Sequence, residues 1–394
     1  MNAVDDAAFE HPALARATRA VAAAIGKADA LADRGVEDRL VAVDAERLAA
    51  RLDGDGEGHG GSGERRARTR RLDSRDSARC RRGQPPGAAA TSSATVTDRP
   101  TRFKRPVLLI VGCGDVGLRV VALLARRWRV LALTSTPPRV AALRAAGVVP
   151  LRGDLDVAAS LARLAALADA VLHLAPPASS GARDLRTAHL LHALARSRRL
   201  RRIVYASTTG VYGDRAGAPT AETAPARPAT DRARRRADAE ERVRRFGRRH
   251  GAAGTVLRVP GIYALDRAGG DPRERVARGT PVLAAADDVY TGHVHADDLA
   301  RACVAALHRG RPQRIVNVVD DSALKMGDYF DLVADRFALS RPPRVSRAEA
   351  AAQLSPLQMS FLAESRRLVN ERMKRELRVV LRHPTVADGL AERR

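Results

Sequence analysis

Residues 107–117 read VLLIVGCGDVG, and this stretch decides the fold. Five apolar residues predict a buried strand that runs directly into three glycines, Gly112, Gly114 and Gly117. The first glycine permits a tight turn, the second lets backbone amides approach a pyrophosphate, and the third allows close packing of the next helix. That helix would present unpaired N–H groups to the anion. The pattern predicts a dinucleotide site formed by Gly112, Cys113, Gly114, Asp115, Val116 and Gly117.

Strands and helices are expected to alternate from residue 105 onward. The apolar pattern predicts strands at 107–111, 129–133, 148–151, 170–174, 203–206 and 255–259, and helices at 116–126, 138–145, 157–167, 185–196 and 232–246. Short, continuously apolar strands between amphipathic helices are typical of a parallel sheet covered on both faces. The expected fold class is α/β, with a doubly wound parallel sheet of the Rossmann type.

The first 104 residues differ in composition from the rest. Residues 1–52 are alanine-rich with apolar positions at helical spacing, which predicts a helical extension. Residues 53–104 are rich in Arg, Gly and Pro and poor in large apolar side chains, which predicts a disordered linker. An anion-binding tail is an alternative interpretation, because residues 65–82 hold nine arginines and two aspartates. A mis-assigned start upstream of the true gene product is another.

Composition limits the class of protein. The chain has 394 residues, is 45% hydrophobic and carries a formal net charge of +24, yet only Lys27, Lys104, Lys325 and Lys374 are lysines and 3% of residues are aromatic. An arginine excess with few rings for base stacking argues against nucleic acid as the partner. Cys80, Cys113 and Cys303 lack metal-ligand spacing, so no metal site is expected. Without a signal-peptide pattern or a long apolar run, a cytoplasmic protein with no membrane segment is expected.

Residues beyond the glycines favour NADP over NAD. An acidic residue normally follows the second strand and binds the ribose 2′-hydroxyl of NAD, but here Ser135, Thr136 and Arg139 occupy that region. Arginine suits a 2′-phosphate, although Arg139 is also explained as one more surface arginine. Asp154 and Leu155 follow the third strand, where a carboxylate could accept a bond from the adenine or simply cap a helix. The backbone of Ala175 and Pro176 after the fourth strand is expected to line a ribose, and His173 is expected to be a core histidine.

Several segments in order resemble the extended and atypical short-chain dehydrogenases/reductases, and among these the NAD-dependent epimerase/dehydratase, or nucleotide-sugar epimerase-like, branch. The segments are residues 112–117, GDL at 153–155, VYASTTGVYGD at 204–214, RVPGIYA at 258–264, HVHADDLA at 293–300 and VNVVDD at 316–321. The resemblance implies a Rossmann domain at 105–260. It also implies a small substrate lobe at 261–394, containing a last strand that returns to the sheet. Pro260 and Gly261 would approach the carboxamide end of the cofactor.

The resemblance breaks at the catalytic pair. Members of this family use a Ser or Thr to position the substrate, a Tyr to transfer the proton and a Lys to hold the ribose and lower the tyrosine pKa. Thr208 falls at the hydroxyl position, but Arg232 and Arg236 stand where the Tyr and Lys are expected. Arginine keeps its proton near neutral pH, so Arg232 cannot replace the tyrosine, whereas Arg236 could still bind a ribose or phosphate. Tyr212 is the best-placed substitute, although the family's tyrosine at that position is usually structural.

Two charged segments in the C-terminal part are open to structural and functional interpretations. His293, His295, Asp297 and Asp298 suggest a metal site, but without a distant third ligand we favour a packing role. Residues 364–374 predict a charged, solvated helix.

The leading hypothesis is a cytoplasmic NAD(P)-dependent oxidoreductase that transfers hydride at a carbinol carbon of a sugar-like or small hydroxylated substrate. Thr208, Tyr212 and Arg236 are its candidate catalytic residues. The alternative is a non-catalytic NADP(H)-binding sensor or scaffold, and a weaker one is a nucleic-acid-associated protein. The resemblance also implies a homodimer as one option for the oligomeric state.

Overall fold

A computed structural model describes residues 105–124 and 127–391. The helical extension and linker expected before residue 105 lie outside the described residues. Among the residues that the structure does describe, no helix is both long and apolar enough to span a bilayer.

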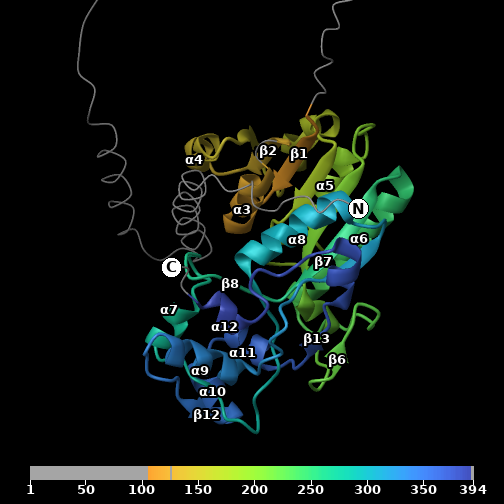
Figure 1. Ribbon diagram of the computed structural model, residues 1–394. Coiled ribbons are helices and arrows are strands. Elements are labelled where there is room, and N and C mark those ends of the chain that lie inside the picture. The colour runs from red at the N-terminus through yellow and green to blue at the C-terminus, as the bar shows by residue number, and fades with distance from the viewer. Residues whose placement is uncertain (1–104, 125–126, 392–394) are drawn as a thin grey trace, which may run out of the picture. The chain divides into compact units, whose positions relative to one another are not determined.

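A seven-stranded parallel sheet forms the centre of the fold (Figure 1). Its spatial order is β11-β7-β5-β4-β1-β2-β3. The bounds are β1 Val107–Val111, β2 Arg129–Thr134, β3 Val149–Arg152, β4 Ala170–His173, β5 Arg202–Thr208, β7 Ala253–Val259 and β11 Arg314–Asn317. The order confirms the predicted Rossmann-type sheet, with its reversal between β1 and β4. In such sheets, ligands bind at the carboxyl ends of the strands beside the reversal.

Helices cover both faces of the sheet. One face packs against α3 Asp115–Leu124, α4 Arg139–Ala145 and α8 Ala296–Arg309, and the other against the 3₁₀ helix η2 Ala158–Ala166, α5 Leu185–Leu194 and α6 Asp231–His250. Continuously apolar strands are required because both faces are buried: Leu108, Leu109 and Ile110 of β1 are fully buried. The expected elements are all present, and the helix predicted at 157–167 is the 3₁₀ helix Ala158–Ala166. Propensity alone does not distinguish a 3₁₀ helix from an α-helix.

The C-terminal part forms a separate hydrophobic cluster around Val282, Leu283, Tyr329, Phe330 and Val333. Its elements are β8 Gly261–Tyr263, α7 Pro272–Ala277, β9 Val282–Leu283, β10 His293–His295, α9 Met326–Arg336, β12 Arg344–Val345, α10 Arg347–Gln353, α11 Pro356–Leu362 and α12 Val386–Gly389. Between them the chain returns to the sheet through α8 and β11.

The prediction of a charged helix over residues 364–374 is wrong. The segment contains β13 Arg367–Leu368, which pairs with β6 Pro219–Thr220, and then the π-helix η4 Met373–Leu377. Hydrogen bonds from distant residues decide this conformation. The Arg367 amide donates to the Ala218 carbonyl, and the Val369 amide donates to the Thr220 carbonyl.

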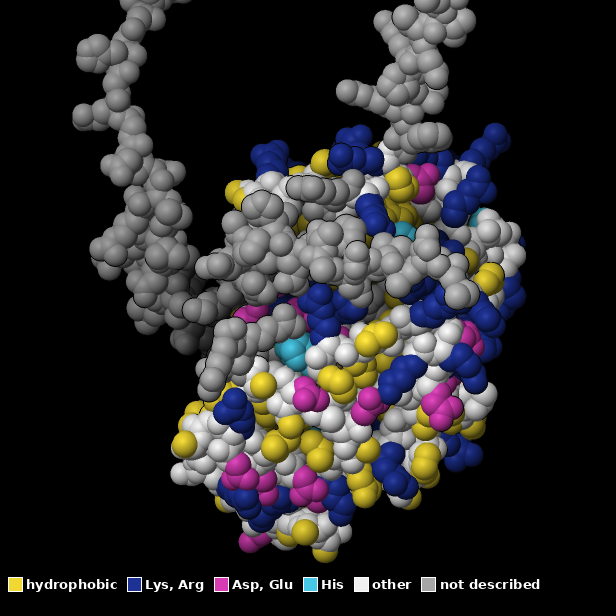
Figure 2. Space-filling model, viewed as in Figure 1, with side chains coloured by type: hydrophobic (Ala, Val, Ile, Leu, Met, Phe, Trp, Pro, Cys, Tyr) yellow, Lys and Arg dark blue, Asp and Glu magenta, His cyan; other side chains and the backbone are white. Residues whose placement is uncertain are grey.

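Basic side chains are spread over those parts of the face that Figure 2 colours by side-chain type, and around α9 to α11 they lie among Asp and Glu side chains. Many described arginines form ion pairs, as Arg341 does with Asp335 and Arg199 with Asp169. Much of the positive charge is therefore compensated locally.

Candidate dinucleotide and active site

The bend after β1 lies at the reversal of the sheet and brings two strand ends into contact. Gly112 has φ +85°, and a Cβ atom at this residue would lie 2.4 Å from the backbone nitrogen of Ala175, just after β4. Any side chain would therefore strike backbone that cannot move aside. The amides of Leu174 and Ala175 both donate to the carbonyl of Val111, at 2.8 and 3.0 Å, which fixes this approach. The bend leads directly into α3, whose first turn is the kind of helix N-terminus that can face a diphosphate.

The side chains of the glycine-rich turn point into the protein. Cys113 and Val116 are buried, and burial raises the pKa of the Cys113 thiol to about 12. A Cβ on Gly117 would lie 3.2 Å from the Cys113 sulfur, so the third glycine allows α3 to pack on the turn. These residues can therefore offer a cofactor their backbone groups, while their side chains hold the turn in place.

The end of β2 carries the residues expected near the adenosine ribose. Ser135 and Thr136 are exposed. Arg139, in the first turn of α4, donates through Nη2 to the carbonyl of Cys113 at 2.6 Å, and its charge opposes the effect of burial on the Cys113 pKa. The structure thus brings Arg139 to the glycine-rich turn, 26 residues before it in sequence.

The segments after β3 and β4 lie at the same edge of the sheet. The carboxylate of Asp154 accepts the Asp156 amide at 2.9 Å, so it caps a local turn. The Leu155 carbonyl accepts a hydrogen bond from His189 of α5 at 2.8 Å. Ala175 is buried and Pro176 is exposed. This placement leaves the adenine-binding role predicted for Asp154 open.

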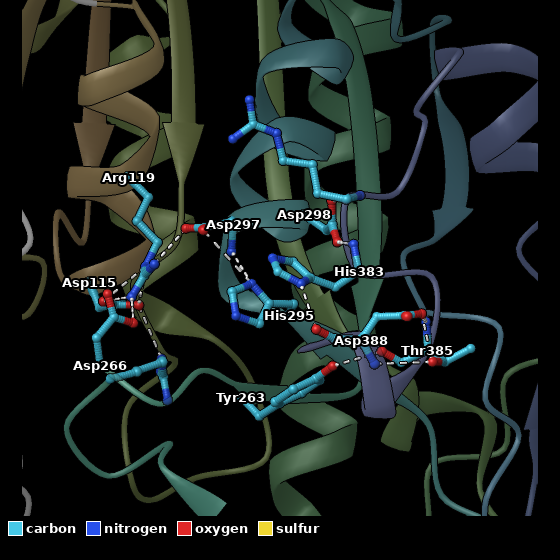
Figure 3. A network of polar contacts seen from close by, with 12 residues as sticks. Asp115, Arg119, Tyr263, Asp266, His295, Asp297, Asp298, His383, Thr385 and Asp388 are labelled. Carbon is cyan, nitrogen blue, oxygen red and sulfur yellow. Dashed lines mark hydrogen bonds and ion pairs between the residues drawn. The ribbon is translucent and has the colours of Figure 1, made fainter. Parts of the chain in front are cut away.

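Figure 3 shows a network of charged groups that joins the start of α3 to the C-terminal part. Arg119 is 7% exposed and contacts Asp115 at 3.1 Å, Asp266 at 2.6 Å and Asp297 at 2.5 Å. Arg267 adds a second cation, with its Nε 3.2 Å from Asp115. Asp115, predicted to contact the cofactor, is therefore already paired with two guanidinium groups. The one local signal for this network is the i, i+4 spacing of Asp115 and Arg119.

The HVHADDLA segment holds part of this network. His295 caps α8 by accepting the Asp297 amide at Nδ1, at 3.2 Å, and its ring lies 3.8 Å from that of His383. Candidate ligand atoms of His295, Asp297 and His383 all lie within 4.8 Å of one another. His383, which is distant in the sequence, is thus placed beside His295 and Asp297, and the local pattern of the HVHADDLA segment gave no signal for it. However, Asp297 is paired with Arg119, and His295 Nδ1, the ring atom that faces Asp297, already accepts the hydrogen bond that caps α8.

The residues after the sixth predicted strand lie at the same carboxyl edge. Gly261 is exposed at the start of β8, and its amide donates to the Gly292 carbonyl at 3.3 Å. Pro260, just before it, is half-buried. Both stay predicted contacts for the nicotinamide end of a cofactor.

Thr208 ends β5 at the carboxyl edge of the sheet. It is half-buried and caps the short helix η3 Thr209–Tyr212, accepting the Gly210 amide at 3.3 Å. Its neighbour Ser207 points the other way and donates to Glu240 at 2.5 Å, where Glu240 also pairs with Arg258 at 2.7 Å. Thr208 is thus held at the edge where a substrate would be positioned, whereas Ser207 belongs to a buried ion-pair network.

Tyr212 lies in the core. It is 0% exposed, its hydroxyl donates to the Asn317 side chain at 2.7 Å, and the Arg258 guanidinium covers its ring at 4.4 Å. Burial raises its pKa. A proton donor must reach a substrate, and this hydroxyl is committed to a buried amide. The geometry therefore favours the structural role over the predicted catalytic one.

Arg236 reaches the same edge from α6. Its Nη1 donates to the Ala206 carbonyl at 2.7 Å and to the Tyr205 hydroxyl at 3.1 Å. Tyr205 is fully buried beside His173, whose ring lies 5.1 Å away. His173 contacts Thr187 at 2.9 Å, and burial lowers its pKa to about 3, as expected for a neutral core histidine.

Arg232 and Arg235 flank Arg236 on α6. The Arg232 guanidinium lies 4.6 Å above the Phe361 ring of α11, so it joins the sheet domain to the C-terminal part. Arg235 is 6% exposed and donates to the Gly181 carbonyl at 2.6 Å. The sequence analysis placed Arg232 and Arg236 at this site but missed Arg235, which burial alone reveals.

Comparison with known proteins identifies what this arrangement resembles. The model of the NAD dependent epimerase/dehydratase family matches residues 108–318. No curated protein matches the sequence. Among solved structures, a functionally unknown conserved protein from Silicibacter pomeroyi is 29% identical, with TM-score 0.61 over 72% of this chain and 96% of that one.

Two nucleotide-sugar epimerases share the fold. UDP-glucose 4-epimerase from Thermotoga maritima is 21% identical, with TM-score 0.60 over 72% of this chain and 96% of that one. UDP-glucuronic acid 4-epimerase from Bacillus cereus, solved with NAD, is 17% identical, with TM-score 0.57 over 72% and 94%.

Proposed function

Because this chain belongs to the NAD dependent epimerase/dehydratase family, we propose that it is an NAD(P)-dependent oxidoreductase that acts on a hydroxyl-bearing sugar or nucleotide sugar. The observation that carries the proposal is the bend at Gly112, which lies at the reversal of the sheet and excludes any Cβ atom. Backbone amides of residues 112–117 would hold the diphosphate, and Ala175, Pro176, Pro260 and Gly261 would line the nicotinamide half. When bound, the nicotinamide supplies a hydride acceptor.

The chain's own residues supply positioning. Thr208 would hold the substrate hydroxyl at the end of β5, and Arg236 would donate to the nicotinamide ribose or to an anionic group. We prefer NADP to NAD as the cofactor, because Arg139 lies at the glycine-rich turn and no carboxylate stands at residues 134–139. The proton must pass to a group other than Arg232, Arg236 or Tyr212, with water as the simplest carrier.

Substitution of Gly112 tests the dinucleotide site. Gly112→Ala should weaken NADH and NADPH binding at least about tenfold in calorimetry, because its Cβ would displace the Ala175 backbone. Gly147→Ala is the matched control, since Gly147 also has positive φ (+74°) but a Cβ there meets nothing within 4 Å. If the unmodified protein binds neither dinucleotide, or if both variants lose affinity equally, the proposal is wrong.

A non-catalytic NADP(H) sensor is the second candidate. It is favoured by the guanidinium groups at 232 and 236, which cannot give up a proton near neutral pH. Thr208→Ala distinguishes the two. If the protein is an enzyme, this variant should lose most turnover of UDP-sugars while NADPH binding stays unchanged. Full turnover in the variant would remove Thr208 from the chemistry, and no turnover in either protein would favour the sensor.

A further inference from the structure

We infer that Arg232, Arg235 and Arg236 of α6, here called the arginine cluster, bind an anionic group of the substrate, a carboxylate or a phosphate, beside Thr208. The inference deepens the proposed function. It rests on that function in one respect, because the bound anion is taken to be part of the enzyme's substrate. The binding of an anion by the cluster can be measured independently.

The cluster lies next to the end of β5. Spacings of three and four residues place Arg235 and Arg236 one helical turn from Arg232. Arg236 donates to the carbonyl of Ala206, two residues before Thr208. The first turn of α6 also adjoins η3, since a Cβ on Gly210 would lie 3.7 Å from the Thr208 methyl and 3.8 Å from the Ala233 Cβ. The positive charge and the positioning hydroxyl therefore occupy one small region.

Within the described residues, no carboxylate forms an ion pair with any arginine of the cluster. Their hydrogen bonds go to neutral groups: the Gly181 carbonyl, the Ala206 carbonyl and the Tyr205 hydroxyl. Other arginines of the same helix are paired, as Arg234 is with Asp231 at 2.6 Å and Arg242 with Asp238 at 2.7 Å. The cluster thus differs from Arg234 and Arg242 of the same helix, each of which has a carboxylate partner.

Nearby carboxylates are already engaged. Glu240, one turn after Arg236, pairs with Arg258 at 2.7 Å and accepts from Ser207. Glu364 pairs with Arg366 at 2.6 Å, although its charge also acts on Arg232. Neither group is a dedicated counter-ion for the cluster.

Of the three arginines Arg235 is buried, Arg236 is half-buried and Arg232 is exposed, so the cost of the uncompensated charge is greatest at Arg235. Arg235 is 6% exposed, and its Nε has no hydrogen-bond partner in the part of the chain that the structure describes. Loss of solvent, followed by the positive charge of Arg236, lowers the pKa of Arg232. Buried cations are normally paired, because an unpaired guanidinium loses its hydration without compensation. A bound anion would supply the missing acceptors.

Carboxylates and phosphates are the anions that fit. Guanidinium groups present planar pairs of N–H donors, which match two oxygens of one carboxylate or phosphate. A neutral sugar hydroxyl would leave the charge uncompensated. We therefore assign the cluster to a substrate that carries a carboxylate or phosphate close to the reacting carbon.

Simple anions test the site directly. Inorganic phosphate and malonate, compared with sodium chloride at equal ionic strength, should raise the Tm of the full chain. The rise should persist in Arg234→Gln, an exposed arginine of the same helix, and be at least halved in the double variant Arg232→Gln/Arg236→Gln. Arg235 is left unchanged because its burial makes loss of folding a complication. An equal rise with chloride, no rise in the unmodified protein, or a full rise in the double variant would each overturn the inference.

A matched pair of nucleotide sugars identifies the source of the anion. UDP-glucuronate and UDP-glucose differ by one carboxylate, so NAD-saturated protein should bind UDP-glucuronate about tenfold more tightly if the cluster takes a carboxylate. The double variant should then lose that preference. If the unmodified protein binds UDP-glucuronate and UDP-glucose equally well and the double variant binds both more weakly, the diphosphate is the anion. If the double variant binds both as tightly as the unmodified protein does, the inference is contradicted. NAD binding by the unmodified protein, measured separately, tests the dinucleotide site alone, so failure of this inference can be distinguished from failure of the proposed function.

Discussion

Arg139 is the residue on which cofactor preference is expected to depend. It lies in the first turn of α4 and donates to the Cys113 carbonyl at 2.6 Å, close to where the phosphates of a dinucleotide would bind. A guanidinium here can pair with the 2′-phosphate of NADP, and such charge-assisted bonds contribute about 1.5–3 kcal/mol.

Arg139→Ala should therefore weaken NADPH binding by about tenfold or more and leave NADH binding nearly unchanged. Calorimetric titration with the two reduced dinucleotides measures both affinities. Arg144→Ala, at the other end of the same helix, is the control and should change neither. Equal losses for NADPH and NADH after Arg139→Ala would show that Arg139 only supports the glycine-rich turn.

At the scale of elements, Arg119 connects α3 to α8 and to the loop after β8. Its guanidinium contacts Asp115, Asp266 and Asp297 (Figure 3). Burial by itself would raise the pKa of Asp297, but the charge and hydrogen bond of Arg119 outweigh it, so the pKa of this carboxyl is lowered in the folded chain. The same arginine thus holds the first turn of the dinucleotide-binding helix against the C-terminal part.

Arg119→Met should lower the free energy of unfolding by about 3 kcal/mol, because it removes the cation shared by the buried Asp115 and the half-buried Asp297. Arg199→Met, which removes an exposed pair with Asp169, should cost less than about 1 kcal/mol. Urea denaturation of the three proteins measures the difference. A similar small loss in both variants would mean that the network contributes little to stability.

The pH dependence of stability gives an independent measurement of the same network. A carboxyl whose pKa is lowered on folding stabilises the protein fully above its unfolded pKa of about 4, and this contribution is lost as the pH falls through the folded value. The acid side of the stability profile should therefore be flatter in Arg119→Met than in the unmodified protein. An unchanged slope would show that Asp297 keeps its pKa without Arg119.

For the whole molecule, the question is whether residues 1–101 contribute to cofactor binding. Every residue proposed to contact the dinucleotide lies between 112 and 261, and the family match covers residues 108–318. A chain beginning at Arg102 should therefore bind NADPH with the affinity of the full chain. Calorimetry on both proteins tests this, and loss of binding in the shorter chain would show that the first 101 residues complete the site.

The sequence by itself determined the sheet and the dinucleotide turn. Continuous apolar strands and the spacing of Gly112, Gly114 and Gly117 are local patterns, so the Rossmann-type parallel sheet followed from them. The resemblance to the family rested on several such motifs in order along the chain. The bounds of several elements were less accurate, because neighbouring elements decide where a helix or strand ends.

Only the tertiary structure decided the roles of individual charged and aromatic residues. Tyr212 became a core residue through Asn317, 105 residues away. Asp115 acquired Arg267 as a partner through three-dimensional packing, and Arg119 acquired Asp266 and Asp297 in the same way. Pairing and burial depend on residues that are distant in the sequence, and no local pattern encodes which arginine will meet a carboxylate. The arginines at 232, 235 and 236 look alike in the sequence. Packing leaves them without a counter-ion in the described chain, whereas Arg234 beside them is paired.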